Sequence, residues 1–239
     1  MKTASFWIGT YTTPGQHARA IQGEGILRGS IDLDSGAVEL RTASRQTPDP
    51  SYLARSGDRL FAVAERMGHR GEVHEYRILD NGRLKPLQVR DSGGDNACFL
   101  TVHGDHLLVA NYMDDRLACL PTQGPTQLLH GAAYLGSGPN PKRQSKPHPH
   151  HCLWLPASGQ VGVCDLGSDR IWLHPATPSS LDPTLAGSIV LPAGTGPRHM
   201  VSRWGHLYVL GELSGRLHHL HYREGEWTLL HSSDPVSSQ

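Results

Sequence analysis

The chain lacks any stretch in which apolar residues recur with the 3.6-residue period of an amphipathic helix, so a helical fold is not expected. It also lacks an apolar run long enough to cross a bilayer. Residues 1–11 carry a single lysine and a short apolar run interrupted by Gly9, which is unlike a secretory signal peptide. We therefore expect a cytoplasmic protein without a membrane partner.

An excess of charge of either sign is absent too, because 22 Lys and Arg residues are matched by 22 Asp and Glu residues. Without a net field the chain has no general attraction for nucleic acid or an anionic membrane, so we expect a small-molecule partner. No Cys-x-x-Cys pair is present. Buried free thiols are therefore the favoured interpretation of the four cysteines, Cys98, Cys119, Cys152 and Cys164.

Two absent motifs narrow the chemistry further. No Gly-x-Ser-x-Gly sequence is present, which argues against a serine esterase. No glycine-rich segment follows a strand and opens a helix, as a dinucleotide or phosphate loop must. We expect no cofactor.

What the chain does contain is turn-forming residues and a repeat. It has 27 glycines and 17 prolines, which favour a mostly antiparallel β protein. Five alternating stretches each end in a polar residue: FWIGTY, LFAVAE, LLVANY, VGVCDLG and LYVLGE. If Thr10, Glu65, Asn111, Asp165 and Glu212 are equivalent, the spacings are 55, 46, 54 and 47 residues. That period is typical of the four-stranded blades of a β-propeller, in which equivalent strand ends converge on one channel.

The strand pattern predicts five blades, the first of them incomplete. Units two and five each divide into four strands, whereas the first opens on FWIGTYT and supplies only three. The tail SSDPVSSQ, which contains Pro235, is a poor candidate for the missing strand. We therefore expect a single all-β propeller domain over residues 1–239, an open arc with exposed blade edges, and self-association through those edges.

At this point the motifs resemble a known family. The lactonase-type seven-bladed β-propellers, which include the cycloisomerase-like 6-phosphogluconolactonases and the more distant carboxymuconate-lactonizing enzymes, share these motifs in the same order. They are IGTYT, PSYLA with LFAVAE, LLVANY, RQSKPHPHH, DLGSDRI, and GTGPRHM with LYVLGEL. By this resemblance the last two blades and a further Arg-bearing motif are missing, and DNACF (residues 95–99) replaces a usual Pro-Cys-His pattern.

The resemblance implies hydrolysis of a sugar lactone, with 6-phosphogluconolactone as the best guess. The alternatives are a muconate-type lactonizing cycloisomerase and a catalytically impaired or non-catalytic propeller that acts as a binding module. Hydrolysis of a lactone requires a base for water, donors for the developing oxyanion and an acid for the leaving alkoxide. The family motifs place these roles on His148 or His150, Arg198 and Glu212.

Substrate-binding candidates surround these residues in the sequence. Arg143 and Lys142 would bind an anion, and His199 follows Arg198. The repeat alignment places His150 and Arg198 at equivalent entrances to innermost strands. Glu212 or a histidine would be the base, and Arg198 the clamp that stabilises negative charge.

Each candidate also has a structural interpretation. The His148, His150 and His151 run lacks an acidic or Cys partner at metal-site spacing, so no metal is expected. Some of the recurring residues Glu65, Asn111, Asp165 and Glu212 are expected to bind the backbone of neighbouring blades, and Glu65 and Asp165 are interpreted as structural. Asp169 and Arg170 (in DLGSDRI) are interpreted as a local ion pair.

Overall fold

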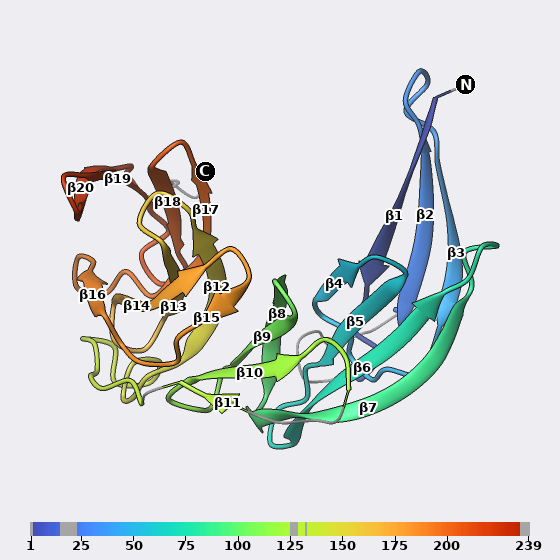
Figure 1. Cartoon of the computed structure of the whole chain (residues 1–239), viewed down its shortest axis with the longest axis horizontal. Coiled ribbons are helices and arrows are strands. Elements are labelled where there is room, and N and C mark those ends of the chain that lie inside the picture. Colours follow the sequence, from blue (N-terminus) through green and yellow to red (C-terminus); the bar gives the residue numbers. More distant parts are fainter. Residues whose placement is uncertain (1, 15–22, 125–128, 132, 235–239) are drawn as a thin grey trace. The chain divides into compact units, whose positions relative to one another are not determined.

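The computed structural model describes residues 2–14, 23–124, 129–131 and 133–234. These residues form twenty strands and no α-helix (Figure 1). No helix that is long and apolar enough to cross a membrane is found among them. The chain divides into two compact units, residues 1–100 and 101–239, which are described separately below.

The first unit contains two sheets, each of which is a meander of consecutive antiparallel strands (Figure 1). The first sheet has three strands, β1 (Thr3–Gly9), β2 (Ile26–Asp32) and β3 (Val38–Ser44). The second has four, β4 (Leu53–Ser56), β5 (Arg59–Ala64), β6 (Arg70–Ile78) and β7 (Leu84–Asp95). A buried cluster of Ile26, Leu60, Ala62 and Tyr76 packs the two sheets together.

Strand β8 (Ala97–His103) carries the chain from the first unit into the second and belongs to the third sheet. Its partners in order are β9 (His106–Asn111), β10 (Leu117–Pro121) and β11 (Leu129–His130). The fourth sheet comprises β12 (Pro149–Leu155), β13 (Gln160–Asp165), β14 (Arg170–Thr177), β15 (Ser180–Leu181) and β16 (Gly187–Val190). The fifth comprises β17 (Pro197–Arg203), β18 (His206–Gly211), β19 (Leu217–Arg223) and β20 (Glu226–Ser232).

The core of the second unit lies between the fourth and fifth sheets. In β18 alternate residues are buried there, because the side chains of a strand point to opposite faces in turn, whereas β13 is buried on both faces after Gln160. Gly162 of β13 leaves room for this packing, since a Cβ at that position would lie 2.9 Å from a Leu155 side-chain carbon and 3.2 Å from one of Met200. The cluster contains Leu155, Cys164, Ile171, Leu173, Ile189, Leu191, Met200, Leu207, Val209 and Leu220.

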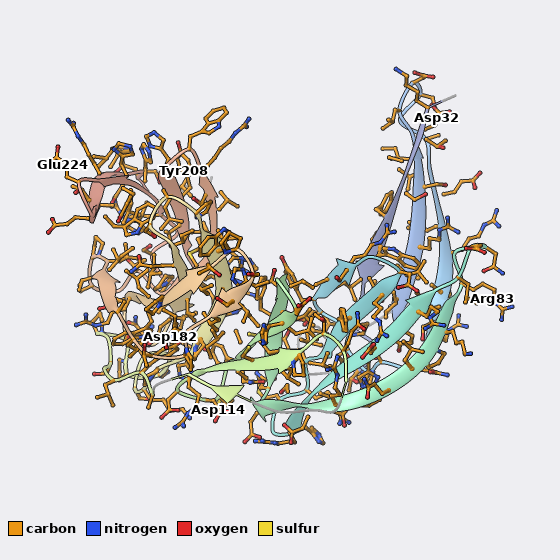
Figure 2. The ribbon with its side chains drawn as sticks, in the orientation of Figure 1. Asp32, Arg83, Asp114, Asp182, Tyr208 and Glu224 are labelled. Carbon is orange, nitrogen blue, oxygen red and sulfur yellow. The ribbon has the colours of Figure 1, made fainter. Side chains whose placement is uncertain are left out.

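The all-β class, the blade pattern and the three-stranded first sheet are confirmed in the described part of the chain. All four cysteines are buried and free, as expected. The fourth sheet has five strands instead of four, because both β15 and β16 pair with β14. The opposite face of β17 and β18 exposes Val201, Tyr208 and Leu210; Tyr208 is labelled in Figure 2. The open arc, the single domain and self-association remain predictions.

Candidate active site

Two β-bulges at the starts of neighbouring inner strands place the first candidate residues. In β12, Pro149 pairs with Asp165 and His151 with Cys164, so His150 is the extra residue between two paired ones. In β17, Pro197 and His199 are paired in the same way and Arg198 is the extra residue. A bulge bends the strand and redirects a side chain, which is why such irregularities are found beside functional sites. The predicted equivalence of His150 and Arg198 is confirmed.

The predicted equivalence of the polar strand ends holds for Thr10, Glu65 and Glu212, each of which follows the last residue of its strand. It is wrong by one residue for Asn111 and Asp165, which are themselves the last residues of their strands. The second strands of the last three sheets have six residues each and end at Asn111, Asp165 and Gly211. Glu212 is therefore equivalent to the residue after Asn111, which is Tyr112, and Asp165 is equivalent to Gly211. Because a shift of one residue exchanges the two faces of a strand, Asp165 points into the blade and Glu212 does not.

Glu212 lies between two arginines, Arg143 from the loop before β12 and Arg198 from the bulge of β17. Nη2 of Arg143 donates a 2.6 Å hydrogen bond to one carboxylate oxygen of Glu212, and Nη1 of Arg198 donates to the other. The same Nη2 of Arg143 also donates to the hydroxyl oxygen of Tyr112 at 3.2 Å. We call Arg143, Glu212 and Arg198 the open triad, because its side chains are 41%, 22% and 40% exposed.

The open triad retains capacity to bind a ligand. Nε and Nη2 of Arg198, and Nη1 of Arg143, make no hydrogen bond to any described residue. Burial alone would raise the pKa of Glu212, but hydrogen bonds from the two guanidinium groups outweigh it and lower the pKa below its usual value. Glu212 is therefore a charged anchor for two cations whose outer N–H groups remain available to an anion.

His148 has a defined tautomer. Its Nδ1 lies 2.7 Å from the carbonyl oxygen of Tyr112, and a carbonyl only accepts, so Nδ1 carries the proton and Nε2 the lone pair. The ring stacks on Tyr112 at a centroid distance of 4.5 Å. Burial lowers the pKa of His148, and the bond to the carbonyl opposes this only in part. The side chain is thus a neutral imidazole with a basic nitrogen at neutral pH.

The other three predicted histidines lie together: His150 and His151 are buried, and the half-buried His199 contacts both. Ring centroids of His150 and His151 lie 5.6 Å and 4.7 Å from that of His199. Burial, helped by the nearby charge of Arg198, lowers the pKa of His150 to about 3. Burial also lowers the pKa of His151 to about 3, and the pKa of His199 is lowered for the same reason. All three remain neutral near pH 7.

The structure also shows which predicted residues belong to the scaffold. The buried Asp165 carboxylate accepts bonds from the backbone N–H of His148 at 2.6 Å and of Gly167 at 3.0 Å, as well as from Trp172 Nε1 at 2.9 Å. In the first unit, Glu65 accepts a 3.0 Å bond from the Tyr11 hydroxyl. Asp165 therefore has the expected structural role.

The predicted ion pair between Asp169 and Arg170 is wrong. The carboxylate of Asp169 is buried and bonds the backbone of Gly194 and Gly196, while Arg170 donates to the Ser188 hydroxyl at 2.9 Å. Adjacent strand and turn residues point to different sides, so sequence neighbours need not pair.

Lys142 is exposed and lies beside the open triad in the sequence, next to Arg143. It lines a shallow groove of about 520 Å³ with Pro139, Asn140, Gly194 and Leu213. The described residues include no group of three or more His, Cys, Asp or Glu side chains that could hold a metal ion. The chemistry available here is therefore guanidinium, carboxylate and imidazole.

Tyr112 was missed by the sequence analysis. It follows β9, contacts Arg143 through its hydroxyl, and both stacks on and orients His148. An aromatic residue at the end of an apolar strand is normally interpreted as part of the hydrophobic core. Only its equivalence to Glu212 indicates that Tyr112 belongs to the candidate site.

Comparison with known proteins shows the family to which the chain belongs. The profile of the family described as "Lactonase, 7-bladed beta-propeller" matches residues 5–238. The chain belongs to this family. Among its lactonase relatives, the 6-phosphogluconolactonase of Bacillus subtilis is 29% identical over 226 residues, which is 90% of this chain and 62% of the relative. The chain therefore spans less than two thirds of that relative's length.

Solved structures of the family agree with the fold. The periplasmic gluconolactonase of Pseudomonas aeruginosa is 26% identical with a TM-score of 0.80, covering 100% of this chain and 70% of that one. A Lactobacillus plantarum protein is 23% identical with a TM-score of 0.82, covering 100% of this chain and 70% of its own. At that identity the second structure supports the fold alone.

Proposed function

We propose that this site hydrolyses a sugar lactone, with 6-phosphogluconolactone as the best candidate substrate. The observation that supports it most is the open triad, in which Glu212 anchors two guanidinium groups beside a neutral imidazole of fixed tautomer. Two relatives, the 6-phosphogluconolactonase of Bacillus subtilis and the periplasmic gluconolactonase of Pseudomonas aeruginosa, support the substrate class.

In this proposal His148 is the base. Its Nε2 accepts a proton from water as the water oxygen attacks the lactone carbonyl carbon, and the imidazolium then returns that proton to the ring oxygen as the C–O bond breaks. The product is the open-chain hydroxy acid. Glu212 is the weaker candidate for the base, because both of its oxygens accept guanidinium bonds and its pKa is lowered. His150, with a pKa of about 3, is also a weaker base.

In this proposal the two arginines stabilise the negative charges of the substrate and of the transition state. The outer N–H groups of Arg198 stabilise the oxyanion that develops on the carbonyl oxygen. Arg143, whose guanidinium is fixed by Glu212 and Tyr112, binds the distal anionic group of the substrate together with Lys142. The ring of His199 lies next to those of His150 and His151, and in this proposal the three rings limit the access of water to the site.

A pH-stat assay with freshly prepared lactones tests the proposal. We expect hydrolysis above the spontaneous rate, with a kcat/KM for 6-phosphogluconolactone at least about tenfold above that for the unphosphorylated lactone. Lys142→Gln should reduce that preference, whereas the matched surface variant Lys85→Gln, on β7 of the first unit, should not.

A folded protein that hydrolyses neither lactone would contradict the proposal. Calorimetric binding of 6-phosphogluconate by such a protein would favour the binding-module alternative. Loss of the ultraviolet absorbance of a carboxymuconate would instead favour a lactonizing cycloisomerase.

A further inference from the structure

A buried carboxylate outside the open triad is bonded to the loops that carry it. Asp169 immediately precedes β14, its side chain is buried, and its backbone has a φ of 55°, a left-handed conformation that is uncommon for a residue other than glycine. Such a conformation persists where surrounding contacts impose it, and it is more frequent at functional sites.

The Asp169 carboxylate accepts three hydrogen bonds from N–H groups. The backbone amides of Gly194 and Gly196 each donate at 2.7 Å, and Nε2 of Gln144 donates at 2.8 Å. None of the described cationic side chains bonds to it, so a buried charge is held by amide dipoles alone.

Two of the donors, Gln144 and Gly196, lie beside the three members of the open triad. Gln144 follows Arg143 in the chain, and Gly196 lies two residues before Arg198. The carbonyl oxygen of Gly196 also accepts the backbone N–H of Glu212 at 2.8 Å. One carboxylate therefore links the backbone segments on which all three charged side chains depend.

The donors themselves are fixed. The fully buried side chain of Gln144 also donates to the Leu166 carbonyl at 3.0 Å and accepts from the Asn140 amide at 3.1 Å, which defines which end of its amide faces Asp169. Gly196 has a φ of 55°, and a Cβ there would lie 2.4 Å from the Leu213 side chain. The turn before Arg198 thus requires glycine and presents its N–H groups inward.

We propose that Asp169 is a positioning residue that sets the separation of the Arg143 and Arg198 guanidinium groups. It does so by bonding both the Gln144 side chain, which follows Arg143, and the backbone of the turn that precedes Arg198. It touches neither substrate nor reacting atoms. Its effect on rate rests on the proposed function, but its effect on the arginines does not, and the two are tested separately.

The first measurement needs no variant and no substrate. Amide hydrogen exchange of the wild-type protein should show Gly194 and Gly196 protected to a degree comparable with residues inside β18, although neither lies in a strand interior. Rapid exchange at both amides would overturn the proposal.

The second measurement compares Asp169→Asn with a matched variant, Asp49→Asn. Asp49 is also buried and has a φ of 45°. Its carboxylate accepts hydrogen bonds of 2.7 Å from the backbone N–H groups of Thr12 and Thr13, but it lies in the first unit. The side-chain Nε–H NMR signals of Arg143 and Arg198 should shift or broaden in Asp169→Asn and stay unchanged in Asp49→Asn. Unchanged signals in folded Asp169→Asn would overturn the proposal.

If Asp169→Asn does not fold, Gln144→Met removes one of the three donors at similar volume. It should perturb the Nε–H signal of Arg143 more than that of Arg198. If the Nε–H signals of both arginines in this variant equal those of the wild type, the positioning role of Asp169 would be contradicted.

Kinetics add the last readout. Asp169→Asn should lower kcat/KM about 10- to 100-fold, as expected for misplaced catalytic groups, and Asp49→Asn should change it less than about twofold. In an Arg198→Ala background the added effect of Asp169→Asn should shrink to less than about threefold, because both act on one group. If the NMR changes occur and the wild type shows no hydrolysis, the proposed function fails while the positioning role stands.

Discussion

Each compact unit contains a glutamate held between two arginines, and the two arrangements differ in how far their side chains reach solvent. In the first unit Glu75, on β6, accepts a 2.9 Å bond from Nη2 of Arg90 and a second bond from Nη1 of Arg59. Its side chain is 0% exposed, and that of Arg90 is 1% exposed. We call Arg59, Glu75 and Arg90 the closed triad. The side chain of Gln88 donates a further hydrogen bond of 2.8 Å to the same carboxylate.

The open triad of the second unit has the same ingredients at the end of a strand instead of on its face. Glu212 is 22% exposed and its arginines about twice as much, so their outer N–H groups can reach a ligand. The closed triad contributes to the fold because its carboxylate and the Arg90 guanidinium are almost completely shielded from water. An open one loses less stability when it is broken, and it retains donors for an anion.

The largest expected effect is on the closed triad. Glu75→Gln removes a buried negative charge that bonds both Arg90 and Arg59, and we expect the free energy of unfolding, measured in urea, to fall by about 3–5 kcal/mol. Glu212→Gln, the matched change in the open triad, should cost about 1 kcal/mol or less. Equal losses from the two variants would remove the distinction.

Arg198→Ala should have the next largest effect, on activity instead of stability. Loss of one preorganised donor should reduce transition-state stabilisation by about 2–4 kcal/mol in kcat/KM. Arg198→Lys should recover little, because an ammonium lacks the planar fork. Activity within about threefold of wild type in the Ala variant would exclude Arg198 from the site.

The rate of lactone hydrolysis, measured as a function of pH, should fall on the acidic side as a single group is protonated. Because the pKa of His148 is lowered by burial, the base stays neutral below its ordinary pKa of 6.5, and the rate should fall about tenfold per pH unit only below the lowered value. His148→Gln should abolish that decrease together with most of the rate, whereas Glu75→Gln should leave it intact. An unchanged profile in His148→Gln would assign the base elsewhere.

The same burial affects stability with pH. His150 and His151 are neutral in the folded chain down to pH about 3, while in the unfolded chain they protonate near 6.5. Their contribution to stability is complete above pH 6.5 and is lost progressively as the pH falls toward 3.

Tyr112→Phe should give the smallest effect. It removes the hydroxyl that accepts a hydrogen bond from Arg143 but keeps the ring that stacks on His148 and the backbone carbonyl that His148 binds. The transition-state stabilisation calculated from kcat/KM should therefore fall by about 0.5–1.5 kcal/mol. The loss should appear mainly in KM for the phosphorylated substrate. A loss as large as that of Arg198→Ala would give Tyr112 a direct role.

Much of the fold could be predicted from the sequence, because each blade is a local meander with its own alternation and turns. The strands of the second and fifth sheets agree with the predicted ones to within a few residues, and the first sheet has three strands as expected. The one-residue error arose because polar strand ends were aligned by chemistry, whereas equivalence is set by backbone pairing.

The candidate site was predictable only in part, for a related reason. Motifs identified His148, Arg198 and Glu212, but contacts between loops are long-range in sequence. No local pattern shows that the Asp169 carboxylate bonds Gly194 and Gly196 instead of pairing with the adjacent arginine. The bulges at His150 and Arg198 are likewise visible only in the register.

The central claim is that the open triad carries function and the closed triad carries the fold. The rate of hydrolysis of fresh 6-phosphogluconolactone by wild type, Glu212→Gln and Glu75→Gln, at a temperature where all three are folded, tests it most directly. We expect Glu75→Gln to keep the wild-type kcat/KM and Glu212→Gln to lose at least about 30-fold, equivalent to about 2 kcal/mol. A wild-type rate no higher than the spontaneous one, or equal rates in both variants, would contradict it.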